Sequence, residues 1–266
     1  MAAAVRDKAQ RGAYDTVTTE ADFAHVVTDD LRAVSHDRHA MLDWKSLGGP
    51  ATAEEQQWAR EDAENERTAG FGLVERLPGN VGRIVLNAFQ PGNGVRAVVA
   101  KHMSEVADAS VLILDLREND GGDPAIVAYV ASYVFDPPRV HLNDMWWRDD
   151  GSTFESWTVP DVPGQRFGGK KPVYVLTSGR TFSAGEELAY DLQALHRASI
   201  IGETTKGGAH PVRREKLSPT FTLRVPTGRA INPVTRTNWE GVGVKPDVVV
   251  PAEKALEEAL RQAGKG

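Results

Sequence analysis

The sequence contains no cysteine among its 266 residues. This absence excludes a thiol nucleophile, a disulfide and a zinc site with cysteine ligands. No apolar run approaches the roughly 18 residues that a membrane-spanning helix needs, so we expect no membrane span. The excess of acidic over basic residues gives a net charge of −6, which disfavours nucleic acid as a partner.

Motifs for metals and nucleotides are also missing. The chain has no H-E-x-x-H, no G-x-x-x-x-G-K-[ST] and no G-x-G-x-x-G after a strand, and its seven histidines are not spaced as metal ligands. We therefore expect neither a metal nor another cofactor. The start, "MAAAVRDKAQRGAYD", lacks the apolar stretch of a signal peptide. We expect a cytoplasmic protein if Met1 is its native start, and an exported one if a leader has been removed.

Residues 1–69 are predicted to form a helical N-terminal segment and a polar connection. Apolar residues recur there at helical spacing, and Thr19 or Asp22 is placed to cap the helix. The residues expected on its buried face are Phe23, Val26, Val27, Leu31 and Val34.

Residues 70–266 are predicted to form one α/β domain. Two short strands flank "PGN", and buried strands within "SVLILDLREND", "KPVYVLTS" and "ASIIGETT" alternate with helices. Asp123 and Pro124 mark one helix start. The aromatic stretch 140–159, with "DDGS" in its middle, indicates an inserted β-hairpin.

Three strand ends carry residues that could take part in chemistry, because sites in α/β sheets form beyond the carboxyl ends of strands. They read "DLRENDGGDPA", "SGRTFSAGEE" and "GETTKGGAHPV". Taken alone, the first is a glycine turn. In the second, Ser183 and Glu186 fit a capping box, although a serine at a helix start can also be a nucleophile. The third holds Lys206 and His210, either of which is a possible base or a solvated side chain.

Taken together and in order, these segments and "TNWEGVGVKPDVVV" resemble the tail-specific (C-terminal processing) serine peptidases over about residues 70–255. "LRAVSHDRHAML" is similar to one branch, which includes the modules of interphotoreceptor retinoid-binding protein and the tricorn-type peptidases. The resemblance implies a crotonase-like (ClpP/crotonase) β/α superhelix. The stretch between Trp44 and Gly70 is too short for the family's peptide-binding PDZ insertion, so we expect none.

The resemblance also implies the roles of individual residues. Ser183 matches the nucleophile of the family. The oxyanion hole would use the backbone N–H of Ala184 and that of Gly121 or Gly122.

The general base departs from the better-known pattern, in which a lysine serves. Gly208 stands at that lysine position, and Lys206 comes two residues early. The tricorn-like branch uses a histidine and a downstream glutamate, which match His39 and Glu240; His36 is the less favoured alternative. We therefore expect His39 to be the base, with Lys206 as the alternative.

The predicted function is that of a serine peptidase-like hydrolase, which forms an acyl-enzyme with a peptide or a small acyl substrate. One alternative is a non-catalytic module that binds an apolar ligand; the aromatic residues for such a pocket would be Trp146, Trp147, Phe154 and Trp157. Another is a cyclising acyl-transfer enzyme with the same residues. The oligomeric state stays open.

Overall fold

The computed structural model describes residues 1–45 and 53–264. Residues 46–52 belong to the connection in which no PDZ insertion is expected, and they lie outside the described residues. No helix in the described part is long and apolar enough to cross a membrane.

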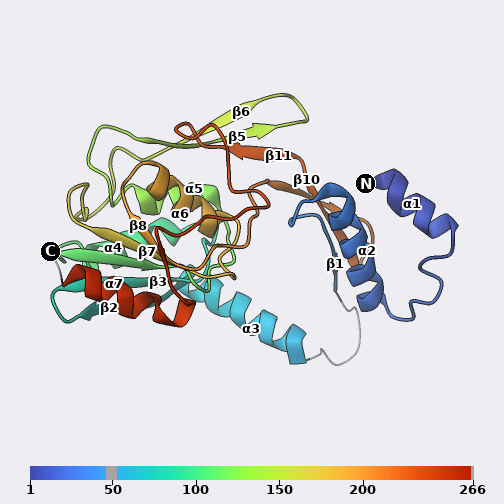
Figure 1. Cartoon of the computed structure of the whole chain (residues 1–266), viewed down its shortest axis with the longest axis horizontal. Helices are drawn as coiled ribbons and strands as arrows, with labels where there is room; N and C mark the ends of the chain where they lie inside the picture. The colour runs from blue at the N-terminus through green and yellow to red at the C-terminus, as the bar shows by residue number, and fades with distance from the viewer. Residues whose placement is uncertain (46–52, 265–266) are drawn as a thin grey trace.

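A six-stranded sheet forms the centre of the molecule (Figure 1). In spatial order its strands are β12 (Val248–Val249), β8 (Ser199–Gly202), β7 (Val173–Thr177), β4 (Val111–Asp115), β3 (Val81–Leu86) and β2 (Phe71–Leu77). Neighbouring strands from β12 to β3 are parallel, whereas β2 pairs antiparallel with β3 across the "PGN" turn. The predicted α/β class and the predicted buried strands are therefore confirmed.

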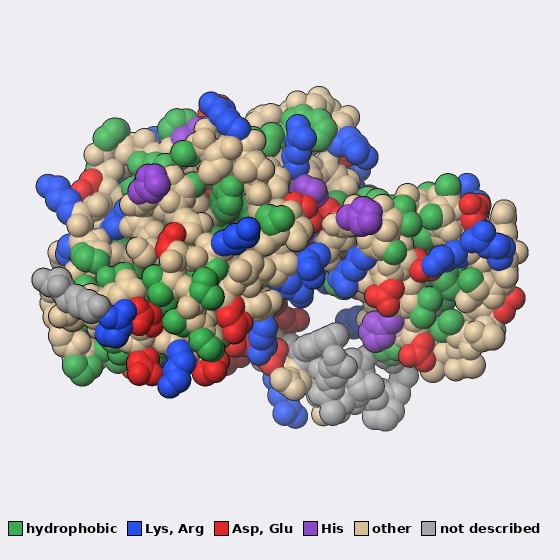
Figure 2. All heavy atoms as spheres, in the orientation of Figure 1, with side chains coloured by type: hydrophobic (Ala, Val, Ile, Leu, Met, Phe, Trp, Pro, Cys, Tyr) green, Lys and Arg blue, Asp and Glu red, His purple; other side chains and the backbone are tan. Residues whose placement is uncertain are grey.

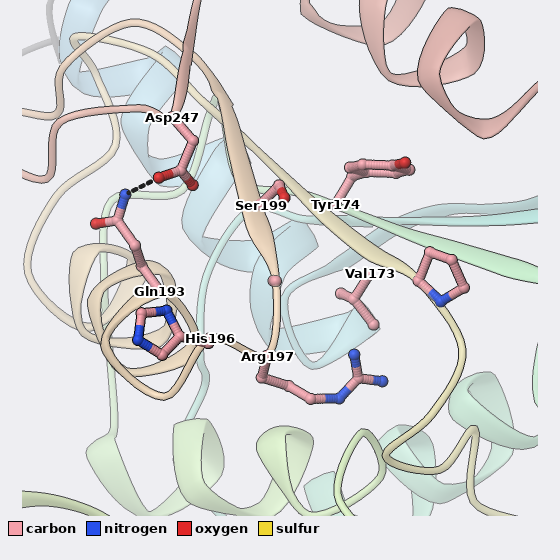
Figure 3. A pocket seen from close by; sticks show the side chains of 9 residues that line it. Val173, Tyr174, Gln193, His196, Arg197, Ser199 and Asp247 are labelled. Carbon is pink, nitrogen blue, oxygen red and sulfur yellow. Dashed lines mark hydrogen bonds between the residues drawn. The ribbon is translucent and has the colours of Figure 1, made fainter. Parts of the chain in front are cut away.

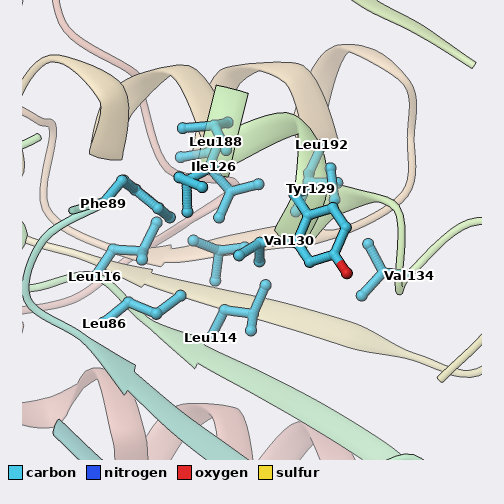
Figure 4. Packing of buried hydrophobic residues seen from close by; sticks show 14 of the residues in the cluster. Leu86, Phe89, Leu114, Leu116, Ile126, Tyr129, Val130, Val134, Leu188 and Leu192 are labelled. Carbon is cyan, nitrogen blue, oxygen red and sulfur yellow. The ribbon is translucent and has the colours of Figure 1, made fainter. Parts of the chain in front are cut away.

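Helices cover both faces of this sheet (Figure 1). One face packs against α4 (Val95–Glu105), α5 (Pro124–Ala131) and α6 (Ala184–Ala194), and the other against α7 (Ala255–Ala263), which follows the short helix η1 (Ala252–Lys254). Between the first three helices and the sheet lies the main core, in which side chains such as Leu114, Val130 and Leu188 are fully buried (Figure 4). The start of α5 is as predicted, since the side chain of Asp123 accepts the Ala125 N–H at 2.8 Å.

The N-terminal segment consists of α1 (Ala2–Gln10), α2 (Glu20–Ser35) and β1 (Met41–Trp44), and α3 (Ala53–Thr68) connects it to the sheet. β1 corrects the expectation of a wholly helical start, because it pairs with β10 (Phe221–Pro226), which in turn pairs with β9 (Val212–Lys216). Sequence patterns could not reveal this pairing, because its two strands lie far apart in the chain.

The expected buried face of α2 is partly wrong. Thr19 caps the helix by accepting the Asp22 N–H at 3.0 Å. Val26 and Val34 are exposed, because the face that meets β1 consists of Ala24, Val27, Thr28 and Leu31. The polar Thr28 belongs to this buried face because its hydroxyl accepts the Leu42 N–H at 2.9 Å.

The inserted hairpin is confirmed as β5 (His141–Trp147) and β6 (Thr153–Trp157). A third strand, β11 (Gly228–Ile231), pairs with β5, and the three form a small sheet above the helices in Figure 1.

We predict that Leu188→Ala lowers the free energy of unfolding by about 2–5 kcal/mol, because it leaves a cavity beneath α6. Leu217→Ala is the control, since Leu217 is 60% exposed and its truncation should change stability by less than about 0.5 kcal/mol. Urea unfolding followed by tryptophan fluorescence measures both. Equal losses in the two variants would contradict the assignment of α6 to the core.

Candidate active site

Ser183 stands between β7 and α6, at the carboxyl end of the parallel sheet. It is the residue before the first turn of α6, and its backbone has φ +53° and ψ −119°. A non-glycine residue in this region is strained by about 1–3 kcal/mol and persists only where its surroundings hold it. Strained turns of this kind between a strand and a helix are typical of nucleophilic serines.

The carboxylate of Glu186 holds this turn in place. It accepts the backbone N–H of Ser183 at 2.9 Å, as one half of a capping box requires. It also accepts the Thr205 hydroxyl at 2.5 Å and the N–H groups of Gly207 and Gly208 at 2.6 and 2.8 Å. Burial raises the pKa of Glu186, although these hydrogen bonds oppose the rise. The serine turn and the glycine-rich loop are thus fastened to one buried side chain.

The glycine turn after β4 lies against Ser183. Gly121 has φ +113°, and a Cβ on it would stand 2.8 Å from the Cβ of Ser183, so a side chain does not fit there. Its N–H already donates to the side chain of Asn119 at 2.9 Å. Within the described residues, the N–H groups of Gly122 and Ala184 have no acceptor, which leaves them as the free donors of the two turns.

Asn119 was missed by the sequence-based reasoning, although it lies inside the quoted "REND" motif. Its buried side chain donates to the carbonyl of Leu86 at 2.9 Å, and the backbone carbonyl of Asn119 accepts the Phe182 N–H at 2.9 Å. It therefore joins the end of β3 to both turns. A buried asparagine must find such partners, but the sequence does not say which ones.

His39 comes from the N-terminal segment and reaches the serine turn. Its ring is buried and lies 4.5 Å, centroid to centroid, from that of Phe182, the residue before Ser183. Burial lowers the pKa of His39 to about 4, which the nearby Asp37 opposes only in part. His39 is therefore neutral at neutral pH. His36, in contrast, is exposed at the left-handed end of α2.

The second candidate base, Lys206, also packs on Phe182. Its Nζ lies 4.8 Å from the centre of that ring, and burial lowers its pKa. Gly208, at the position of the family's lysine, has no room for a side chain. A Cβ there would stand 2.2 Å from the Phe182 ring and 2.8 Å from the His39 ring. The histidine thus fills the space into which a lysine at position 208 would project.

Two carboxylates and a second histidine lie behind His39. One oxygen of Asp37 accepts the backbone N–H of His39 at 2.8 Å and lies 4.0 Å from its Nδ1. The other is 2.5 Å from Nδ1 of His210, so that this nitrogen carries a hydrogen. Glu240 accepts the Ala209 N–H at 2.6 Å and lies 3.6 Å from the same nitrogen. Among the described residues, no hydrogen bond or ion pair joins the side chains of Glu240 and His39.

Burial lowers the pKa of His210, but its hydrogen bond to Asp37 and the charge of Glu240 outweigh this, and the net shift is upward. The donor atoms of these three side chains lie within 4.8 Å of one another, a set that could also hold a divalent cation. His210 already hydrogen-bonds to Asp37, so these two side chains have each other as partners without a metal.

A cavity of about 370 Å³ lies at the opposite end of the sheet (Figure 3). It opens where β7 and β8 begin, whereas Ser183 follows the end of β7. Arg197 on its wall donates to the carbonyls of Val134 and Gly168. This cavity therefore has no part in the serine site.

The aromatic residues considered for an apolar pocket do not converge. Phe154 is 64% exposed, Trp157 stacks on His141 at 4.3 Å, and Trp146 lies under Arg229.

Comparison with known proteins agrees with the geometry of the serine turn. The family model described as peptidase family S41 matches residues 80–250. The chain belongs to this family. The resemblance to the tail-specific peptidases is thereby confirmed, and residues 80–250 include Ser183, both glycines, Lys206 and Glu240, but not His39.

Two relatives are named as processing proteases. The carboxy-terminal-processing protease of Bartonella bacilliformis is 28% identical over 192 residues, which are 70% of this chain and 42% of the relative. The carboxyl-terminal-processing protease of a Picosynechococcus species is 27% identical over 181 residues, 68% of this chain and 42% of the relative. The chain thus spans less than half the length of these relatives.

A solved lipoprotein from Streptococcus agalactiae has a similar fold. The match has a TM-score of 0.66 and 15% identity, and it covers 98% of this chain and 87% of the lipoprotein. The likeness in fold therefore extends to the N-terminal segment that carries His39.

We predict that Gly208→Ala destabilises the chain by about 1–3 kcal/mol, because the added methyl group must displace Phe182 or His39. Gly264→Ala is the matched control, since a Cβ there meets only ordinary contacts of 3.6 Å and more. Urea unfolding of both variants measures the effect. If the urea concentration at the unfolding midpoint were the same for Gly208→Ala as for the unaltered chain, the loop would have room for a side chain.

Proposed function

We propose that this chain is a serine peptidase of the S41 type that cleaves peptide substrates through an acyl-enzyme. The observation that carries the proposal is the meeting of a strained serine, a glycine turn and a buried neutral histidine at one edge of the sheet. These are the parts that acyl transfer requires: a nucleophile, N–H donors for an oxyanion, and a base.

In this mechanism Ser183 Oγ attacks the carbonyl carbon of the scissile bond while His39 takes the serine proton. The resulting oxyanion is held by the N–H groups of Ala184 and Gly122, neither of which has another acceptor in the described part of the chain. We assign Gly121 a shaping role, since its N–H is committed to Asn119. His39 then passes its proton to the leaving amine, and the C–N bond breaks. Water, activated by the same histidine, hydrolyses the acyl-enzyme.

His39 is the proposed base because burial leaves it neutral and able to accept a proton at neutral pH. Asp37 is the carboxylate nearest to its ring, and it fixes the His39 backbone. We assign Glu240 a supporting role through the loop at Ala209 and His210. Lys206 is the alternative base, since its amine packs on the same phenylalanine.

We further propose that the α/β body, residues 70–266, is a crotonase-like β/α superhelix that works with the segment 1–69 and without a PDZ insertion. The support is that the described part of the stretch between β1 and β2 contains one element, helix α3, where a PDZ domain would otherwise be inserted.

Replacement of Ser183 by alanine is expected to lower kcat/KM for an unstructured fluorogenic peptide by at least about 1000-fold, because no other group can form the acyl-enzyme. Labelling by a fluorophosphonate probe should disappear with it. Ser152→Ala, in the exposed hairpin turn, is the control and should keep both signals. Peptide cleavage that survives in Ser183→Ala would refute the proposal.

The pH dependence of kcat/KM separates the two bases. A base acts only when unprotonated, so activity should rise with pH through an apparent pKa of about 4 and be level by about pH 6. His39→Gln should lose activity, whereas Lys206→Gln should keep the same acidic limb. If kcat/KM instead rose only well above pH 7, and this rise were lost in Lys206→Gln, the base would be the lysine.

A further inference from the structure

A groove of about 660 Å³ crosses the outward face of the sheet β1–β10–β9. Its register brings residues of all three strands onto one face: Met41 opposes Arg224, which opposes Arg214, and Asp43 opposes Thr222, which opposes Lys216. The other face of this sheet packs its apolar side chains against α2. Most of the groove is therefore built on regular strands, to which Lys45 and the turn residues Pro219 and Thr220 are added.

The charges in this groove are strongly unbalanced. Among its lining residues are four cations, Lys45, Arg214, Lys216 and Arg224, and a single acid, Asp43. Arg224 pairs with Asp43 at 2.7 Å, and in the described part of the chain no ion pair engages the other three cations. A protein of net charge −6 thus gathers unpaired positive charge here.

The groove lies beside the segment that carries His39. Arg224 lies opposite Met41, two residues after His39, and close enough for its charge to contribute to the lowered pKa of that histidine. Arg32 lies near Arg224 and near Arg38. The positive charges of Arg32 and Arg38 also help to lower the pKa of Lys206, which packs on Phe182. Figure 2 shows Lys and Arg side chains gathered where the N-terminal segment meets the body. Positive charges of the groove and of the N-terminal segment therefore act on both candidate bases.

The neighbouring strand edge favours an extended peptide as the occupant. β9 is the outer strand of its sheet, and an outer strand has backbone groups to which another extended chain can bond. Arg214 and Lys216 are two residues apart on the groove face, so alternate side chains of an added strand would meet them.

We infer that this cationic groove is the substrate-binding surface of the peptidase and that it selects peptides with acidic side chains near the cleaved bond. The inference rests on the proposed function for its catalytic part, but binding alone can test it. Carboxylates complement Lys45, Arg214 and Lys216, which no ion pair engages among the described residues, and the attraction would also speed the encounter with the substrate.

The binding experiment uses the inactive Ser183→Ala chain and two labelled peptides that differ only in Asp and Glu against Asn and Gln. Fluorescence anisotropy at low salt should show the acidic peptide binding at least about tenfold more tightly, with a difference that shrinks as salt is added. Arg214→Glu together with Lys216→Glu should abolish the preference. The control, Lys101→Glu with Arg236→Glu, changes the net charge equally outside the groove and should retain it.

The same peptides are then given to the active chain. We expect the groove variant to lower kcat/KM for the acidic peptide by about tenfold or more and to lower it for the neutral peptide by a clearly smaller factor, because only the acidic peptide loses an attraction between opposite charges. Preferential binding without cleavage would refute the peptidase proposal and leave the groove standing. Three results would overturn the inferred role of the groove. They are cleavage of both peptides without a preference, an equal loss of kcat/KM for both peptides in the groove variant, and binding of a single-stranded oligonucleotide as tight as that of the acidic peptide.

Discussion

The buried carboxylate of Glu186 is the interaction on which the rest of the candidate site depends. It accepts hydrogen bonds from Ser183, Thr205, Gly207 and Gly208. A carboxylate without such partners is very costly to bury, so these donors and the acid require one another. The loop that they fix sets the backbone of Gly208, beside which the ring of His39 lies, and leads on to His210. One side chain thus determines the relative placement of the serine turn and the loop that faces it.

The site also depends on contacts between distant parts of the chain. The pairing of β1 with β10 anchors the segment that carries His39, and the ion pair between Asp37 and His210 closes the same junction. The burial that lowers the pKa of His39 arises only at this junction, where Phe182 and the loop cover the ring. Tertiary packing thereby leaves the histidine neutral and able to accept a proton.

Charge is distributed unevenly over the molecule. The acidic excess of the whole chain does not extend to the sheet next to the serine, where Arg and Lys side chains line the groove. A local field of this kind acts on charged ligands at close range, and it differs in sign from what the net charge suggests. Composition alone therefore describes the partners of such a protein poorly.

Local patterns in the sequence determined the elements of the body: the buried apolar strands, the Asp123–Pro124 helix start, the "PGN" turn and the aromatic hairpin. Each depends on interactions between residues near one another in the chain, so periodicity and turn chemistry suffice to predict them. The resemblance of four ordered motifs likewise pointed to Ser183 and to the family.

Only the tertiary structure decided the surroundings of the serine. It placed Glu186 as a link between two segments, Asn119 between two turns, and Asp37 nearer than Glu240 to the ring of His39. It also paired residues 41–44, expected to be helical, with a strand about 180 residues later. These outcomes depend on which distant groups meet and on what covers them, and the free energy of such contacts has no signature in a local stretch of sequence.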